Sequence, residues 1–225
     1  MSLLNAAYRW FEHPHRFLAL RELGDSPTIL DVGCGNHSPT LTKKYFPGAT
    51  YHGVANEEWN LDARDRELMD AFFQLDLDTV GDLDTIPNGQ YDAVICSHIL
   101  EHVDQYERVI GWLAQKLKPG GILYVEVPSA RSLSFPRAKD GFLGVRGCWN
   151  FYDDPTHKVM VNLGVVQDKL RAGGLQVSEI STRRLWRRVL LLPAYAAAGI
   201  ATRGYIPASV LWDISGFAEV LTARR

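Results

Sequence analysis

The strongest constraint on the fold is a short apolar run that ends in an acid and a glycine turn, at residues 29–36. It reads Ile-Leu-Asp-Val-Gly-Cys-Gly-Asn. An apolar run of this length predicts a buried strand, at 28–32. Because glycine lets another group come close to bare backbone, Gly33 and Gly35 predict a polar ligand or a helix start at the end of this strand.

The chain beyond this turn alternates between predicted helices and strands. We expect further strands at 51–55, 72–75, 91–96, 122–127, 175–180 and 217–223, and helices at 38–46, 57–70, 104–117 and 163–172. Ser38, Asp104 and Asn162 are the expected helix caps. This alternation indicates an open α/β sheet with right-handed crossovers, whose ligand lies at the carboxyl ends of the strands.

Three segments stand outside this alternation, and the length of 225 residues favours a single domain over 1–225 that includes them. Residues 1–27 form an N-terminal helical cap, with a helix at 3–11. Residues 129–161 form a loop longer than most connections unless they are functional, so we interpret it as a substrate loop. Residues 182–214 form a helical insertion before the last strand.

Composition limits the class of partner and the compartment. The formal charge of -2 gives no basic field, so we expect no nucleic-acid partner. The three cysteines are widely separated, and the N-terminus lacks the pattern of a signal peptide. Together with the lack of an apolar run of about 20 residues, these features predict a cytoplasmic protein.

Four segments together resemble the class I S-adenosylmethionine-dependent methyltransferases. They are Ile-Leu-Asp-Val-Gly-Cys-Gly, Phe-Gln-Leu-Asp-Leu at 73–77, Tyr-Asp-Ala-Val-Ile-Cys-Ser-His-Ile-Leu-Glu-His-Val at 91–103 and Leu-Lys-Pro-Gly-Gly at 117–121. The resemblance covers residues 28–180. It implies a Rossmann-like, seven-stranded and mostly parallel sheet with helices on both faces and the last strand antiparallel. It also implies S-adenosylmethionine as the cofactor.

The resemblance also implies a cofactor site. The methionine end would be held by the turn of Asp31, Gly33, Cys34 and Gly35, the adenine would contact Asp76 and Leu77, and Ser97 would line the reacting centre. Simpler roles stay open, because glycines can form a tight turn, Asp76 can cap a helix and Asp31 can accept from loop amides.

One position departs from the family pattern. The family usually has an acid at the end of the second strand to bind the ribose, and Ala55 stands there. Asn56 or Glu57 can replace it, because each side chain can hydrogen-bond a hydroxyl. A nicotinamide dehydrogenase is disfavoured, because this acid and the third glycine of the dinucleotide motif are both missing.

Two histidines are the candidate catalytic bases. Methyl transfer to a hydroxyl requires alignment and removal of one proton. His98 follows a predicted strand end, and His157 lies in the long loop, where it could close over the substrate. Either histidine could instead fix a loop through a backbone hydrogen bond.

The run His98-x-x-Glu101-His102, with the distant His157, could alternatively ligate a divalent metal. Small-RNA 2′-O-methyltransferases have a similar arrangement, with Glu in place of His98. Because Leu-Glu-His is common in the wider family without a metal, we expect no metal here.

Two segments are candidates for acceptor recognition. Residues 135–152 mix basic and aromatic side chains, namely Arg137, Lys139, Arg146, Trp149, Phe151 and Tyr152, which suit a sugar, a phosphate or an aromatic acceptor. Residues 183–192 read as an amphipathic helix whose basic face holds arginines 183, 184, 187 and 188. Such a helix could cover the pocket, contact a membrane peripherally, pack on the domain or form a homodimer interface.

These features predict a methyltransferase that acts on a small or medium acceptor, with oxygen of a sugar or lipid-linked substrate as the preferred target. The alternative is a non-catalytic S-adenosylmethionine-binding module that regulates a partner. The missing acid at Ala55 and the large apolar insertion favour that alternative.

Overall fold

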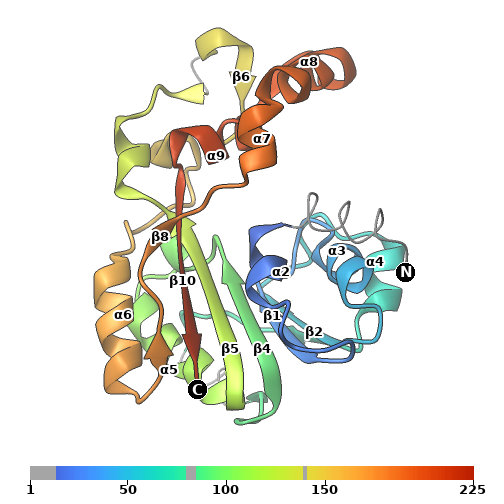
Figure 1. Ribbon diagram of the computed structural model, residues 1–225, viewed down its shortest axis with the longest axis vertical. Coiled ribbons are helices and arrows are strands. Elements are labelled where there is room, and N and C mark those ends of the chain that lie inside the picture. The colour runs from blue at the N-terminus through green and yellow to red at the C-terminus, as the bar shows by residue number, and fades with distance from the viewer. Residues whose placement is uncertain (1–13, 80–84, 139–140) are drawn as a thin grey trace.

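A doubly wound sheet forms the body of the molecule (Figure 1). The computed structural model describes residues 14–79, 85–138 and 141–225, so the predicted helix at 3–11 lies outside the described residues. The parallel strands of the sheet are β1 (Thr28–Val32), β2 (Thr50–Ala55), β3 (Ala71–Gln74), β4 (Tyr91–Ser97) and β5 (Leu117–Pro128). Strand β10 (Ala218–Arg224) pairs antiparallel with β5, and the order is β3-β2-β1-β4-β5-β10-β7. The predicted mostly parallel sheet with an antiparallel last strand is therefore confirmed.

The outer strand beyond β10 is interrupted. Instead of one strand at 175–180, the chain forms β7 (Gln176–Val177) and β8 (Ser181–Thr182), and both pair antiparallel with β10. Between them, the hydroxyl of Ser178 accepts from the amide of Thr222, so a side chain replaces a backbone carbonyl in the ladder. The sheet thus has eight strands in seven positions.

Helices cover both faces of the sheet, as predicted. One face packs against α5 (Tyr106–Lys116), α6 (Leu163–Ala172) and the short 3-10 helix η2 (Leu100–His102), through a large core that includes Leu30, Val94 and Leu113. The other face packs against α2 (His15–Ala19) and α3 (Ser38–Tyr45), through Phe17, Ile29 and Tyr124. Helix α4 (Ala63–Leu68) lies beside α3.

The residues at the starts of the helices show which of the predicted helix caps form. Asn162 caps α6, because its side chain accepts from the amide of Gly164 at 2.9 Å. The cap predictions for Ser38 and Asp104 are wrong: the capping positions are His37 and Gln105, neither of which makes a side-chain cap. The helix predicted at 57–70 is shorter, because Asp62 and Asp65 form a capping box that starts α4 at residue 63.

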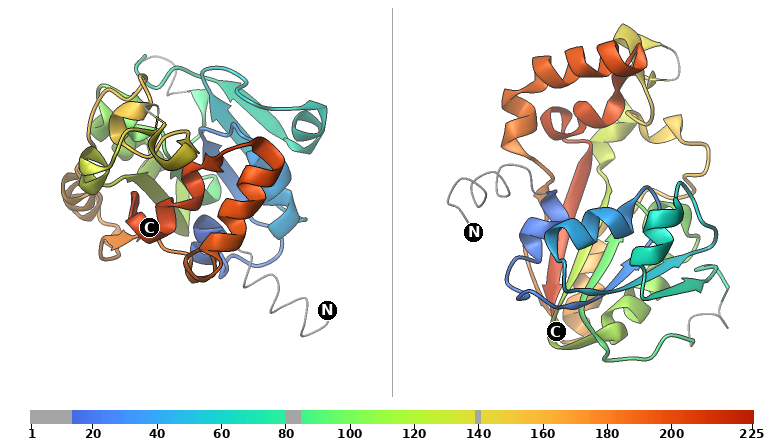
Figure 2. Two further views of the ribbon diagram at one scale, coloured as in Figure 1. Left: turned by 90° about the horizontal axis from the view of Figure 1, so that it is seen from above. Right: turned by 90° about the vertical axis from the view of Figure 1, so that its right-hand side faces the viewer.

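Residues 129–161 and 182–214 pack together above the carboxyl ends of β4 and β5, and we call them the small lobe (Figure 2). The first segment contains η3 (Ala130–Ser134), η5 (Phe142–Gly144), β6 (Val145–Arg146) and η6 (Phe151–Asp153). The second contains α7 (Trp186–Leu190), α8 (Leu192–Arg203), β9 (Ile206–Pro207), η7 (Ala208–Val210) and α9 (Trp212–Ser215). The two segments are joined by parallel pairing of β6 with β9 and by a core of Ala138, Val145 and Ala208.

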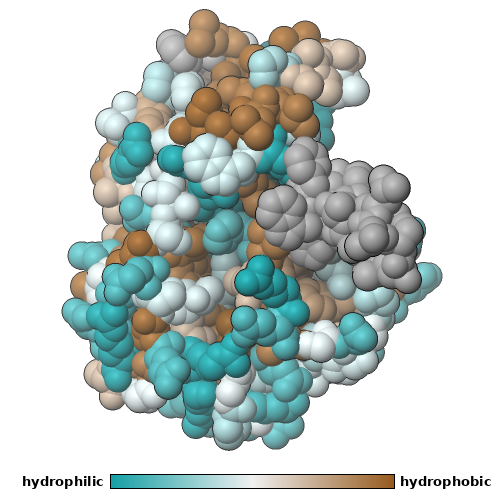
Figure 3. Space-filling view, viewed as in Figure 1, coloured by the Kyte–Doolittle hydropathy of each residue, from teal (hydrophilic) through white to brown (hydrophobic). Residues whose placement is uncertain are grey.

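The prediction of a basic amphipathic helix at 183–192 is wrong. Helix α7 begins at Trp186, whereas Arg183 precedes it and is buried. The exposed side of α7 is apolar, with Trp186 63 % and Leu190 74 % exposed, and Figure 3 shows apolar side chains gathered on the small lobe. Among the described helices, none has the length and apolar character that crossing a bilayer requires.

Candidate active site

The sequence-predicted site residues lie at one edge of the sheet. Asp31 is in β1, Ser97 ends β4, and Asn56 and Asp76 follow β2 and β3. Because these strands are parallel and adjacent, their carboxyl ends meet at this edge. The small lobe lies over the same edge (Figure 1).

The glycine turn after β1 is tightly packed. Gly33 has φ of +84°, and a Cβ there would lie 2.0 Å from Cδ1 of Ile99. A Cβ on Gly35 would lie 2.8 Å from the carbonyl oxygen of Trp59. Both positions therefore require glycine, because Ile99 and Trp59 pack against their backbone.

The two side chains beside these glycines face inward. Asp31 is buried, and its Oδ2 accepts from the hydroxyls of Tyr51, at 2.7 Å, and Ser38. This carboxylate therefore ties the start of α3 to β2. Burial raises the pKa of the Cys34 thiol to about 12, and its Sγ would lie 2.7 Å from a Cβ on Gly53. Cys34 is thus a neutral packing residue.

The polar residues after β2 and β3 lie at the surface. Asn56 and Glu57 are exposed at the end of β2, directly after Ala55. The Asp76 carboxylate accepts from the amide of Asp78 at 3.0 Å and from the hydroxyl of Thr79 at 3.2 Å, so it caps its own turn. Leu77 packs against the large core.

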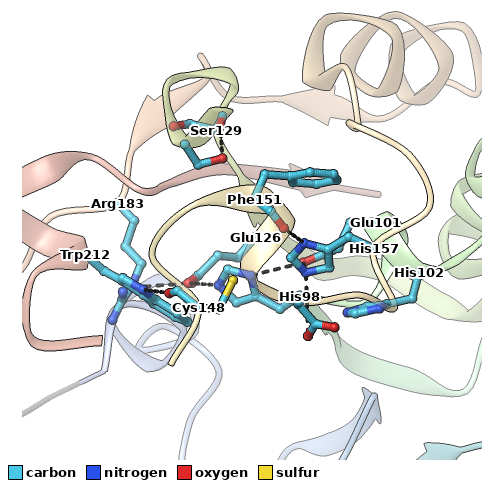
Figure 4. Close-up of polar contacts among 12 residues, drawn as sticks. His98, Glu101, His102, Glu126, Ser129, Cys148, Phe151, His157, Arg183 and Trp212 are labelled. Atoms are coloured by element: carbon cyan, nitrogen blue, oxygen red, sulfur yellow. Dashed lines mark hydrogen bonds and ion pairs between the residues drawn. The ribbon is translucent and has the colours of Figure 1, made fainter. Parts of the chain in front are cut away.

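His98 is held between two carboxylates directly after β4 (Figure 4). Its Nδ1 lies 3.2 Å from Oε1 of Glu101, and its Nε2 lies 3.0 Å from Oε1 of Glu126. Burial by itself would lower the pKa of His98, but the hydrogen bonds to Glu101 and Glu126 raise it to about 9. At neutral pH both ring nitrogens therefore carry protons and donate.

Glu126, in β5, connects His98 to the small lobe. Its Oε1 lies 3.2 Å from Nε of Arg183, and its Oε2 accepts from the hydroxyl of Tyr124. Arg183 also lies 3.8 Å from Asp213 of α9. Burial would raise the pKa of Glu126, but Arg183 and His98 outweigh this effect and lower it.

Sequence reasoning did not identify Glu126 and Asp213 as part of the site, and it placed Arg183 on the basic face of a helix that could cover the pocket. A signal for Glu126 was available, because it is the single acid among the apolar residues of 122–127. Arg183 and Asp213 gave no such signal, because their pairing depends on how the small lobe folds back on the sheet.

The small lobe contacts His98 directly. The ring of Trp212, at the start of α9, lies 5.0 Å from the ring of His98 and stacks on Phe217 at 4.5 Å. The Trp212 indole N–H donates to the carbonyl of Cys148 at 2.8 Å. Both segments of the small lobe and the residue after β4 therefore meet at Trp212.

The structure brings His157 to the other side of Glu101 (Figure 4). The His157 side chain is 5 % exposed, and its Nε2 lies 4.0 Å from Oε1 of Glu101. Its Nδ1 donates to the carbonyl of Phe151 at 2.6 Å. Burial lowers the pKa of His157. Both predicted catalytic histidines thus flank one buried carboxylate.

A cavity of about 610 Å³ opens in the segment 129–161, which is within the size range of small-molecule sites. Its lining includes Arg146, Cys148 and Asp154. The cavity borders His157, because Oδ2 of the lining residue Asp154 lies 3.9 Å from Nε2 of His157.

The other residues proposed for substrate contact have different environments. Arg137 pairs with Asp153 at 3.2 Å, Phe151 is buried and Tyr152 is exposed. Trp149 is half-buried, and Lys139 lies outside the described residues.

The comparisons with known proteins agree with this geometry. Residues 3–165 match the family described as methyltransferase domain, and the chain belongs to this family. The chain is 31 % identical over 194 residues to a ubiquinone biosynthesis O-methyltransferase of Marinobacter nauticus, covering 78 % of this chain and 80 % of that protein.

Two further likenesses are more partial. The chain is 31 % identical to a trans-aconitate 2-methyltransferase of Variovorax paradoxus over 56 % of this chain, but spans only 50 % of that relative. The fold resembles that of an S-adenosylmethionine-dependent methyltransferase from Archaeoglobus fulgidus, with a TM-score of 0.54, 18 % identity and full coverage of both chains.

The protein is therefore an S-adenosylmethionine-dependent methyltransferase. The residues present fit this cofactor at the edge already described. The exposed polar groups of Asn56 and Asp76 follow two neighbouring strands there, and Gly33 and Gly35 keep the turn after β1 free of side chains of its own, with Ile99 and Trp59 packed beside it.

Proposed function

We propose that this enzyme methylates an oxygen atom of a small or medium acceptor that enters the cavity of the small lobe. The observation that carries this proposal is the position of His157, which lies between the buried Glu101 and the cavity residue Asp154. The name of the ubiquinone O-methyltransferase relative supports oxygen as the acceptor atom.

The cofactor would be held by the edge of the sheet. S-adenosylmethionine supplies an electrophilic methyl group when bound. The turn of Gly33, Cys34 and Gly35, placed by Asp31, would hold its methionine end, and Asp76 and Leu77 would contact its adenine. Asn56 and Glu57 would bind the ribose, and Ser97 would line the reacting centre.

The two histidines would have different roles. His98 donates from both ring nitrogens to carboxylates, so it has no lone pair for an acceptor proton. We therefore assign it a positioning role between β4, β5 and the small lobe. His157 donates only from Nδ1 to a carbonyl, which leaves the lone pair of Nε2 to act on the acceptor hydroxyl.

The finer predictions about the acceptor stay open proposals. A sugar or lipid-linked acceptor is supported by the mixture of Arg146 in the cavity lining and apolar residues on α7. The same exposed apolar residues support peripheral membrane contact or a homodimer. A cytoplasmic location also remains a prediction.

The test combines cofactor binding with an acceptor screen. Isothermal titration of the full chain with S-adenosylmethionine and S-adenosylhomocysteine should show binding of both, weakened in Asn56→Ala and Glu57→Ala variants. His157→Gln should then abolish methyl transfer while cofactor binding persists, and His52→Gln, on β2, is the control. If the protein bound neither S-adenosylmethionine nor S-adenosylhomocysteine, the proposed methyl transfer would be refuted.

The non-catalytic alternative is favoured by Ala55, because the expected ribose acid is missing there. It predicts a different result in the same experiment. Cofactor binding would persist, no acceptor would be methylated, and His157→Gln would change neither measurement.

A further inference from the structure

Glu101, His102 and His157 form a cluster that methyl transfer in the family does not by itself require. Each offers one ligand atom, and the three atoms lie within 4.8 Å of one another. Glu101 and His102 belong to η2, whereas His157 comes from the small lobe. The rings of His102 and His157 have centroids 4.8 Å apart. The cluster therefore exists only because the loop folds back over η2.

Both histidines are fixed in the tautomer that suits a metal ligand. Nδ1 of His157 lies 2.6 Å from the carbonyl of Phe151. Nδ1 of His102 lies 3.2 Å from the carbonyl of Thr156 and 3.0 Å from its hydroxyl, which donates its own proton to Asp154 and therefore accepts from His102. A carbonyl can only accept, so each Nδ1 carries the proton and each Nε2 has its lone pair free. Metal-binding histidines are held by backbone or carboxylate acceptors in the same way.

The carboxylate of Glu101 has an unpartnered oxygen. Its Oε1 accepts from His98, whereas its Oε2 is buried with no hydrogen-bond partner among the described residues. A buried carboxylate oxygen without a partner costs free energy, because it has lost water and gained nothing. Glu101 is completely buried, and its Oε1 lies 4.0 Å from Nε2 of His157, so a cation bound at this carboxylate would compensate the unpartnered oxygen.

A second cluster in the same protein provides a contrast. His37, Asp62 and Asp65 also lie close enough to hold a cation. There, however, Asp65 accepts from the Thr40 hydroxyl at 2.6 Å, from the Asp62 amide at 3.1 Å and from His37 at 2.7 Å. Its oxygens are already satisfied, so that cluster stabilises the start of α4 and needs no ion.

We propose that Glu101, His102 and His157 bind one divalent transition-metal cation. Two imidazole nitrogens and one carboxylate oxygen are a donor set typical of such cations, and they leave coordination positions open. The sequence alone favoured a cluster without a metal, because it showed neither the unpartnered oxygen nor the two fixed tautomers.

The consequence for catalysis rests on the proposed function. The cation would lie beside the cavity, since His157 is 3.9 Å from the lining residue Asp154. An acceptor hydroxyl bound to it would release its proton to solvent more readily, because the cation stabilises the oxyanion. With the cation bound, the Nε2 lone pair of His157 is a metal ligand, so the cation replaces His157 as the group that acts on the acceptor hydroxyl.

Metal binding can be measured without any acceptor. Metal-free full-length protein would be titrated with Mn²⁺ and Zn²⁺, with bound Mn²⁺ followed by electron paramagnetic resonance. We expect one cation per chain, with at least a tenfold loss of affinity in His102→Gln and Glu101→Gln. His37→Gln is the matched control, because it changes the satisfied cluster, and it should bind like the unchanged protein.

His102 is only half-buried, so we expect His102→Gln to fold normally. Melting curves would verify that each variant is folded. Failure of the metal-free protein to bind either cation, or equal affinity in His102→Gln and His37→Gln, would overturn the proposal. Methyl transfer that proceeds unchanged in a chelator would refute only the catalytic consequence. Loss of cofactor binding would instead count against the proposed function.

Discussion

Replacement of Arg183 by methionine tests whether buried ion pairs attach the small lobe to the sheet. Methionine keeps most of the length of the side chain but removes its charge. Arg183 pairs with Glu126 at 3.2 Å and lies 3.8 Å from Asp213, and both carboxylates are buried. Removal of one partner of a buried pair costs about 3–5 kcal/mol when the remaining charge is left without compensation. We expect the lower part of this range, because Glu126 still accepts from His98 and Asp213 still lies 3.5 Å from Arg188.

The expected loss is large relative to the free energy of unfolding of the whole protein. Domains unfold with a free energy of about 5–15 kcal/mol, so Arg183→Met removes a substantial part of it. For a chain of this length the melting temperature should fall by about 6–20 °C. Urea unfolding followed by circular dichroism would give the free energy of unfolding directly.

The matched control is Arg171→Met on the surface of α6. Arg171 lies 3.8 Å from Glu179, but both side chains are exposed, so the loss should stay below about 1 kcal/mol. The double variant Glu126→Gln with Arg183→Met should recover part of the stability, because the carboxylate that has lost its arginine is removed as well. Equal losses in Arg183→Met and Arg171→Met would refute the reasoning.

Three further predictions concern local structure. Gly33→Ala should destabilise the fold and weaken cofactor binding in calorimetry, whereas Gly120→Ala, with a similar φ of +80° but open space, should show only the backbone strain. Asn162→Ala should lower the unfolding free energy by about 1 kcal/mol in urea, through loss of the α6 cap. Burial by itself would raise the pKa of Asp65, but hydrogen bonds from Thr40 and Asp62 outweigh this effect and lower it to about 2. The stability that ionised Asp65 contributes is therefore present above about pH 4 and is lost as the pH falls towards 2. The stability difference between the unchanged protein and Asp65→Asn should therefore shrink in acid-unfolding curves over this range.

Local patterns predicted the sheet well because burial on both faces leaves a clear signal. Strands β1 and β4 lie within one residue of their predicted bounds, and Asn162 caps α6 as expected. The failures occur where a distant partner competes with the local one. Ser38 donates to Asp31 instead of capping α3, and Asp104 pairs with Lys158 at 3.0 Å instead of capping α5.

Contacts between residues far apart in the sequence also limited how much of the candidate site could be predicted. The positions of Asp31 and Ser97 follow from strand order, because parallel strands end at one edge. The environment of His98 does not follow from strand order. It depends on Glu126 from β5 and on Trp212 from the small lobe, and these contacts form only in the folded chain.

The buried charges around His98 join stability to the geometry of the site. Glu126 accepts from His98 and pairs with Arg183, so one carboxylate holds both the end of β4 and the segment that leads into α7. Glu101 pairs with His98 on one side and faces His157 on the other. A change at His98 therefore alters the small lobe and the second histidine together. For this reason, loss of activity in a His98 variant does not by itself identify a catalytic base. His157→Gln leaves the network of Glu126 and Arg183 in place, and comparison with His102→Gln, which removes a proposed cation ligand but not the base, separates the two roles of His157.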